Sequence, residues 1–174
     1  MKNQLLIILF LLIVSSTTTY GQDNPPIRNQ FQHFIGVGAG FTTGFGVSYR
    51  YVPDNFGIQL NFAPYYDKNN NSFVSAGLTL LQKLKETPDR KLYLYFGNSL
   101  LYQKTYNEYY NVNYPNSTKT VVTTSNIINT GLGLDFQFYT PNSPFVFDIM
   151  GGLGAYDSFS RVTFTGEFAI YYAL

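Results

Sequence analysis

The sequence predicts an all-β fold, an eight-stranded antiparallel up-and-down transmembrane β-barrel preceded by a cleaved signal peptide. Three observations support this prediction. Apolar and polar residues alternate in segments of strand length, Pro-Asx turns recur between these segments, and no helical period of 3.6 residues appears after the N-terminal segment. Segments of about ten residues with a period of two are typical of barrels that cross membranes.

Composition and charge narrow the class further. Aromatic residues make up 18% of the 174 residues and charged residues only 12%, whereas a soluble domain carries about 25% charged residues. The net charge of +1 includes Lys2, so without its first 21 residues the chain is neutral. This argues against nucleic-acid binding, which needs a basic excess. The sequence has no cysteine, which excludes disulfides, thiol nucleophiles and a lipid-anchored cysteine.

The N-terminal segment has the layout of a secretory signal. One lysine precedes the apolar run Leu5–Val14, small polar residues follow, and cleavage is expected near Gly21. The alternative is a retained anchor, but the run has about ten residues where a spanning helix needs roughly 20. We therefore expect a signal peptide over 1–21, a polar lead-in over 22–32 and a barrel domain over 33–174.

Three similar turns divide the barrel domain into hairpins. Each places proline before Asp or Asn, at 52–55, 87–90 and 140–143, which suits a tight turn. The longest connection, 105–125, lies between the second and third of them. Alternation between these breaks predicts eight strands, at 33–42, 44–52, 56–66, 72–84, 91–104, 126–139, 145–156 and 160–173.

The two faces of the predicted strands differ sharply. One face is apolar and carries no charge, as in Ile35, Val37, Ala39 and Phe41, while the other is polar or small. Eight strands enclose only enough space for side chains to fill, so a face with several Phe, Leu and Ile per strand would overfill the interior. The apolar face is therefore expected to point outward, into lipid. A two-sheet soluble sandwich escapes the volume argument and remains the alternative.

The C-terminal segment 165–174 carries apolar residues at alternate positions up to the last residue, Leu174. Together with the signal segment and the Pro-Asx hairpins, this resembles the small outer-membrane β-barrel families related to OmpA and OmpX, in the style seen in Bacteroidota. The resemblance covers 33–174 and departs from the usual pattern in ending on Leu rather than Phe. It implies an integral outer-membrane location and insertion by the barrel assembly machinery.

Four charged residues fall on the inward face and form the first candidate site: Arg50, Asp135, Asp148 and Glu167. Buried charges need partners, and the guanidinium of Arg50 can bridge carboxylates. We expect all four in the half of the barrel that carries the short turns. They could form a structural plug or, alternatively, a gated or proton-sensitive passage.

The second candidate site is the long connection, read as a protruding hairpin that extends the fifth and sixth strands. Tyr106, Tyr109, Tyr110 and Tyr114 are expected to line it. Exposed tyrosines on strands can bind a partner strand by β-augmentation. The alternative is a solvated hairpin with an interfacial aromatic belt.

The sequence leaves the specific role open. His33 is the single histidine, and no Ser and acid pattern beside it completes a nucleophilic site. We expect a non-enzymatic monomer without metal or cofactor, acting at the cell surface in integrity or adhesion, with membrane lipid and an extracellular protein or glycan as partners. A narrow porin-like channel, a lipid A-modifying enzyme and a soluble secreted ligand-binding β-protein are the alternatives.

Overall fold

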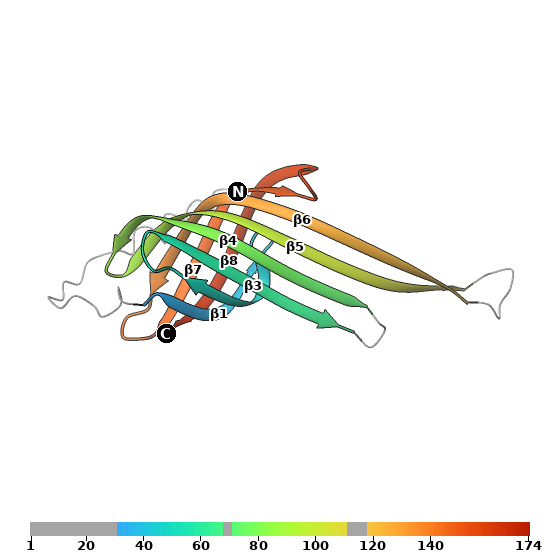
Figure 1. Ribbon diagram of the computed structural model, residues 1–174, viewed down its shortest axis with the longest axis horizontal. Helices are drawn as coiled ribbons and strands as arrows, with labels where there is room; N and C mark the ends of the chain where they lie inside the picture. The colour runs from blue at the N-terminus through green and yellow to red at the C-terminus, as the bar shows by residue number, and fades with distance from the viewer. Residues whose placement is uncertain (1–30, 68–70, 111–117) are drawn as a thin grey trace, which may run out of the picture.

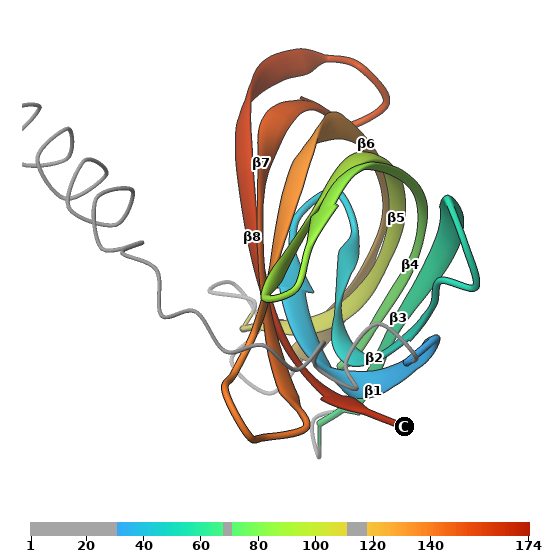
Figure 2. The ribbon, with the colours of Figure 1, turned by 90° about the vertical axis from the view of Figure 1, so that its left-hand side faces the viewer.

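The computed structural model describes residues 31–67, 71–110 and 118–174, which form one closed antiparallel barrel in the order β1 to β8. Figures 1 and 2 show the strands from the side and from one end of the barrel. The signal peptide predicted for 1–21 lies outside the described residues, as does most of the lead-in. The strands are β1 (His33–Gly40), β2 (Gly44–Tyr51), β3 (Phe56–Tyr66), β4 (Ser72–Thr87), β5 (Arg90–Tyr110), β6 (Thr118–Tyr139), β7 (Phe145–Tyr156) and β8 (Arg161–Ala173).

The predicted eight-stranded antiparallel barrel is confirmed, and the predicted strands differ from the observed ones mainly in length. β5 and β6 extend past the predicted ends and pair from Arg90↔Phe138 to Tyr110↔Thr118, so they form a hairpin that projects far beyond the other strands (Figure 1). β1 ends at Gly40 rather than at 42, because the chain turns into the barrel there. We call the end with the long β5–β6 hairpin the hairpin end and the opposite end the turn end.

The outward face is the apolar one, as expected from the volume of the interior. Large apolar side chains exposed on the barrel surface come from every strand, among them Val37 (59% exposed), Val47 (61%) and Leu132 (54%). Arg50, Asp135 and Asp148 are fully buried. The closed ring and this inside-out pattern exclude the sandwich. Among the described residues, no helix is long and apolar enough to cross a membrane.

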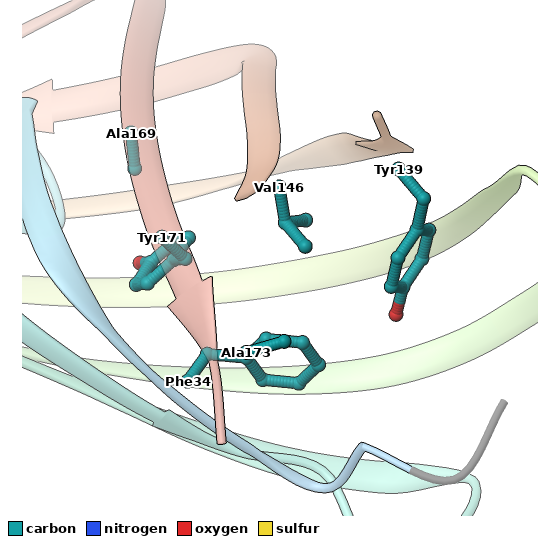
Figure 3. Packing of buried hydrophobic residues seen from close by; sticks show 6 residues of the cluster. All are labelled: Phe34, Tyr139, Val146, Ala169, Tyr171 and Ala173. Atoms are coloured by element: carbon teal, nitrogen blue, oxygen red, sulfur yellow. The ribbon is translucent and has the colours of Figure 1, made fainter. Parts of the chain in front are cut away.

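The small apolar core lies inside the turn end of the barrel. Phe34 packs edge to face on Tyr171, with ring centroids 6.4 Å apart, and Tyr139, Val146, Ala169 and Ala173 complete the cluster (Figure 3). Backbone bonds from Ala173 N to Pro144 O and from Leu174 N to His33 O hold the last strand against its neighbours. This core closes the ring between β8 and β1 at the turn end.

Candidate functional site: the filled lumen

Arg50 on β2 lies at the centre of a buried charge cluster. Its Nη1 atom lies 3.0 Å from Asp135 Oδ2 on β6 and 2.5 Å from Asp148 Oδ2 on β7. The other side of the guanidinium donates to Gln59 Oε1 on β3, from Nε at 3.1 Å and from Nη2 at 2.5 Å. Arg50 therefore ties together strands on opposite sides of the ring.

Two tyrosines enclose the guanidinium. The Arg50 Cζ atom lies 5.0 Å from the ring centroid of Tyr171 and 5.9 Å from that of Tyr93, within the range of a cation–π contact. Asp135 and Asp148 meet Nη1 at ion-pair distance but without hydrogen-bond geometry, and their remaining oxygens have no hydrogen-bond partner. The two carboxylates thus depend on one guanidinium for compensation of their charge.

Glu167 does not join this cluster, so the four charges predicted to form one network do not all contact one another. The register pairs Arg50 with Phe34 at the start of β1, whereas Glu167 pairs with Gly40 at its end. Across β7, Glu167 is in register with Met150 and, through it, with Asp135 on β6, so the two sites lie at neighbouring levels of the lumen. Glu167 binds the β1–β2 turn and not Arg50, so the predicted charge network consists of two adjacent sites with different partners.

Glu167 binds the β1–β2 turn, which folds into the lumen. Its Oε1 atom accepts from Thr42 Oγ1 at 2.6 Å, Thr43 N at 3.0 Å and Thr42 N at 3.2 Å, and its Oε2 atom accepts from Thr43 Oγ1. Thr42 and Thr43 are 0% and 2% exposed. Four donors compensate a buried carboxylate that has no cation beside it.

Side chains from three other strands satisfy the carbonyls of the same turn. Ser99 Oγ and Asn129 Nδ2 donate to Phe41 O at 2.6 and 3.0 Å. Asn61 Nδ2 donates to Thr43 O at 3.0 Å and to Gly44 O at 3.1 Å. The turn 41–43 is thus anchored to β3, β5, β6 and β8 and forms a plug in the lumen. Sequence reasoning missed this plug, because strands predicted at 33–42 and 44–52 leave a single residue to connect them.

Glycines on the facing strands provide the space for the plug. A Cβ atom at Gly77 would lie 1.6 Å from Thr43 O, one at Gly97 2.9 Å from Thr42 O, and one at Gly131 2.2 Å from Thr42 Oγ1. No side chain larger than hydrogen fits at Gly77 while the turn stays in place. Two features of the sequence could have indicated the plug. One is the set of inward glycines on β4, β5 and β6, and the other is the unusually short connection between β1 and β2.

The two sites together fill the lumen. The gap between them, lined by Gly38, Thr43, Gln59, Asn61 and Glu167 among others, has no volume open to a water molecule. Tyr93 and Tyr171 are fully buried beside the Arg50 cluster, and Tyr95 is fully buried in the same interior. The described interior is therefore a packed core with two polar levels, not an open pore.

The Tyr-rich hairpin is only partly described. Tyr106 N donates to Asn71 Oδ1 at 2.8 Å, and Lys104 Nζ lies 4.9 Å from the centroid of the Tyr106 ring. Tyr109 and Tyr110 belong to β5, but their side chains, like all of Tyr114, lie outside the described residues. The backbone places Tyr106, Tyr109 and Tyr110 on the projecting hairpin.

His33 and a cluster of charges lie at the turn end. His33 Nδ1 lies 2.7 Å from Tyr49 Oη, and its ring stacks on Tyr51 at 4.6 Å. Between β4 and β5, Glu86 accepts from Lys83 Nζ at 2.6 Å and lies 3.1 Å from Lys91 Nζ. Burial raises the pKa of Glu86, but hydrogen bonds from the two lysines outweigh it and hold that pKa below its usual range.

Several solved structures are similar to this chain. The N-terminal β-barrel domain of OprF from Pseudomonas aeruginosa is 17% identical, with a TM-score of 0.44, and covers 82% of this chain and 95% of its own. Ail, the attachment invasion locus protein of Yersinia pestis, is 15% identical, with a TM-score of 0.37, and covers 81% of this chain and 91% of its own. The structure of Ail in complex with the heparin analogue sucrose octasulfate is 16% identical, with a TM-score of 0.35, and covers 81% of this chain and 92% of its own. No family model and no curated protein matches the chain.

Proposed function

We propose that this chain is an integral outer-membrane β-barrel protein, without enzymatic activity, that acts through its projecting hairpin in surface integrity or adhesion. The observation that carries the membrane location is the uncharged band of large apolar side chains exposed all around the barrel. In water such a continuous band would drive association, since monomeric soluble proteins rarely expose apolar patches beyond a few hundred Å².

The height of the band supports the proposal. On β8, outward apolar residues run from Val162, 64% exposed, to Tyr172, 46% exposed. Ten residue steps of about 3.4 Å, tilted by about 40°, give a band about 26 Å tall. The apolar band of outer-membrane barrels is about 25 Å tall. The closed ring also leaves no strand edge along most of the barrel, as a hydrocarbon environment requires.

The interior supports a structural role rather than transport. A channel needs a continuous polar path, whereas the plug and the Arg50 cluster leave no room for water between them. The contacts of His33 with Tyr49 and Tyr51 on the barrel surface give no support to a lipid A-modifying enzyme. We therefore prefer a closed barrel to the channel and enzyme alternatives.

The projecting hairpin supports the interaction role. Beyond Lys104, β5 has no further partner on β4, and before Thr130, β6 has none on β7. Among the described residues, β5 beyond Tyr106 and β6 before Ile128 therefore have no strand beside their outer edges, the arrangement that β-augmentation uses. An extracellular protein or glycan is the proposed partner, and Tyr106, Tyr109, Tyr110 and Tyr114 its proposed contacts. The placement among Bacteroidota-style barrels rests on the Pro-Asx hairpins and the C-terminal strand.

Cell fractionation combined with a heat-modifiability gel tests the location. We expect the protein in the outer-membrane fraction, resistant to carbonate extraction and shifted in mobility only after boiling. Recovery as a soluble periplasmic or secreted protein would overturn the proposal. For the hairpin, a variant in which 106–122 is replaced by a two-residue Asn-Gly turn should keep the heat-modifiable band and lose binding to host cells or matrix. Equal binding by both proteins would refute the hairpin role.

A further inference from the structure

The wall of the barrel has a step at its hairpin end. β1 pairs with β8 only up to Gly40↔Glu167, while β7 and β8 stay paired to Tyr156↔Arg161. Among the described residues, the segment 161–166 of β8 therefore has a strand neighbour on one side only. The step exists because the chain leaves the wall after Gly40 to form the plug. Figure 1 shows the β7–β8 hairpin projecting past the barrel wall at this point.

An apolar hollow lies in this step, on the outer surface. Its volume is about 240 Å³, and Ala39, Gly40, Phe41, Phe45 and Gly166 line it almost entirely with carbon. Gly166 leaves the hollow open, because a Cβ atom there would meet nothing nearer than Met150 O at 3.8 Å. We call this hollow the lateral notch. Apolar cavities of about 150 Å³ bind a molecule the size of benzene, so the notch has room for several carbons of an alkyl chain.

The notch is continuous with the apolar band. Val162 and Phe164 stand beside it on β8 and are 64% and 83% exposed, and Phe41 at its rim is 67% exposed. If the band contacts lipid, as the proposed function states, the notch opens sideways into the outer part of the hydrocarbon layer. The backbone groups of 161–165 that face away from β7 then lie near the lipid headgroups, where polar groups need partners.

We propose that the lateral notch binds one acyl chain of a membrane lipid, with the ester or amide group of that lipid against the free backbone edge of 161–165. This inference rests on the proposed membrane location. The chain fills the hollow beside Ala39 and Gly166, and the lipid carbonyl accepts from a backbone N–H of β8. One amphipathic molecule thus satisfies both the apolar hollow and the polar edge next to it.

Two other occupants fit the observations less well. A second copy could pair its own β8 edge with this one only if the two strands ran parallel or antiparallel. In a membrane dimer, a two-fold axis along the membrane normal relates the two copies. Each strand is tilted by about 35–45° from that normal, so facing strands of the two copies cross at about 70–90°. Strands that cross at this angle cannot form a hydrogen-bonded ladder. A peptide strand from outside would have to enter the apolar band between Phe41 and Phe164, both largely exposed to lipid.

Photo-crosslinking tests the proposal with the full mature chain in vesicles. The vesicles contain dioleoyl phosphatidylcholine with a small fraction of phosphatidylethanolamine that carries a diazirine on one acyl chain. Crosslinked peptides are mapped by mass spectrometry. We expect crosslinks concentrated in peptides that contain 39–45 and 161–166, above the level on the opposite wall.

Gly166→Leu fills the notch, and Gly151→Leu is its matched control. The two glycines are direct partners across β7 and β8, both have open space for a side chain, and only Gly166 lines the notch. Gly166→Leu should lower crosslinking at 39–45 about tenfold, the effect of removing roughly two methylene groups from their contact. Gly151→Leu should leave it at the wild-type level. Ala39→Leu, which fills the notch from β1, should act like Gly166→Leu.

The outcomes separate this inference from the proposed function. Failure of the wild-type chain to insert, seen as no heat-modifiable band and no protease protection, would overturn both. Insertion with crosslinks spread evenly around the barrel would overturn the lipid site alone. An unchanged crosslinking pattern in the folded Gly166→Leu and Ala39→Leu variants would also overturn it.

Discussion

Replacing Arg50 with Met is expected to destabilise the barrel strongly. Methionine keeps much of the volume and removes the guanidinium that lies 3.0 Å from Asp135 and 2.5 Å from Asp148. Both carboxylates are fully buried, and among the described residues Arg50 is the one cation within ion-pair distance of either. Removing one partner of a buried ion pair costs about 3–5 kcal/mol. Because two carboxylates lose their partner, we expect the loss of unfolding free energy to lie at the upper end of this range, about 5 kcal/mol.

The surroundings of Arg50 allow a sharper comparison. One guanidinium faces two carboxylates, so the cluster carries one excess negative charge when both are ionised. Asp148→Asn leaves an Arg50–Asp135 pair without net charge and should cost less than Arg50→Met. The triple variant with Met at 50 and Asn at 135 and 148 removes every charge and should recover most of the lost stability, because replacing a buried ion cluster by neutral groups is often neutral or stabilising.

Reversible urea unfolding of the protein in lipid vesicles, followed by the heat-modifiable gel band, measures these differences. The slope of the transition with urea should stay constant, so that the midpoint reports stability. Equal midpoints for wild type and Arg50→Met would refute a central role of the cluster. A triple variant no more stable than Arg50→Met would refute the assignment of the loss to unpaired carboxylates.

Three further expectations concern the plug, the apolar band and the turn end. Gly77→Ala places a Cβ atom 1.6 Å from Thr43 O, so it should expel the plug and produce conductance steps in planar bilayers where the wild type shows none; a silent variant contradicts the plug. Leu132→Arg on the outward face should cost about 2–4 kcal/mol in vesicles, while Thr123→Arg on the projecting hairpin should cost almost nothing; equal costs contradict the lipid band. The lowered pKa of Glu86 means that its stabilisation, below about 1 kcal/mol, is present at neutral pH and is lost as the pH falls below about 4; a Glu86→Gln variant should lack this acid dependence, and identical acid profiles contradict it.

Much of the barrel could be predicted from the sequence because one simple rule controls it. A period of two assigns each side chain to a face, and the limited volume inside eight strands decides which face points outward. These rules correctly placed Arg50, Asp135 and Asp148 inside and Ile35 and Val37 outside. They depend only on local sequence and on the number of strands.

The division of the interior into two sites could not be predicted in the same way. Which buried charges meet depends on the register between strands that are distant in sequence, and alternation leaves the register between different hairpins open. Glu167 alternates like Asp148, yet it lies beside Gly40 and binds Thr42 and Thr43. Inward glycines were equally ambiguous, because the same residues suit an open passage or a close approach of backbone. The inward turn at 41–43 decides between these two uses.

The separation of the two sites leads to a last expectation, on additivity. The Arg50 cluster and the Glu167 site share no ion-pair partner among the described residues, and only a long hydrogen bond, from Gln59 Nε2 to Asn61 Oδ1 at 3.4 Å, links a partner of Arg50 to a residue that holds the plug. Energetic effects of sites that share no direct partner usually add to within about 0.5 kcal/mol. Glu167→Gln replaces one of two acceptor oxygens by a donor that faces the Thr42 and Thr43 donors, so it should destabilise the plug without disturbing Arg50. The urea midpoints of Arg50→Met, Glu167→Gln and the double variant should therefore be additive. A double variant clearly more stable than the sum of the single losses would mean that the four charges act as one network, as the alternation pattern alone suggested.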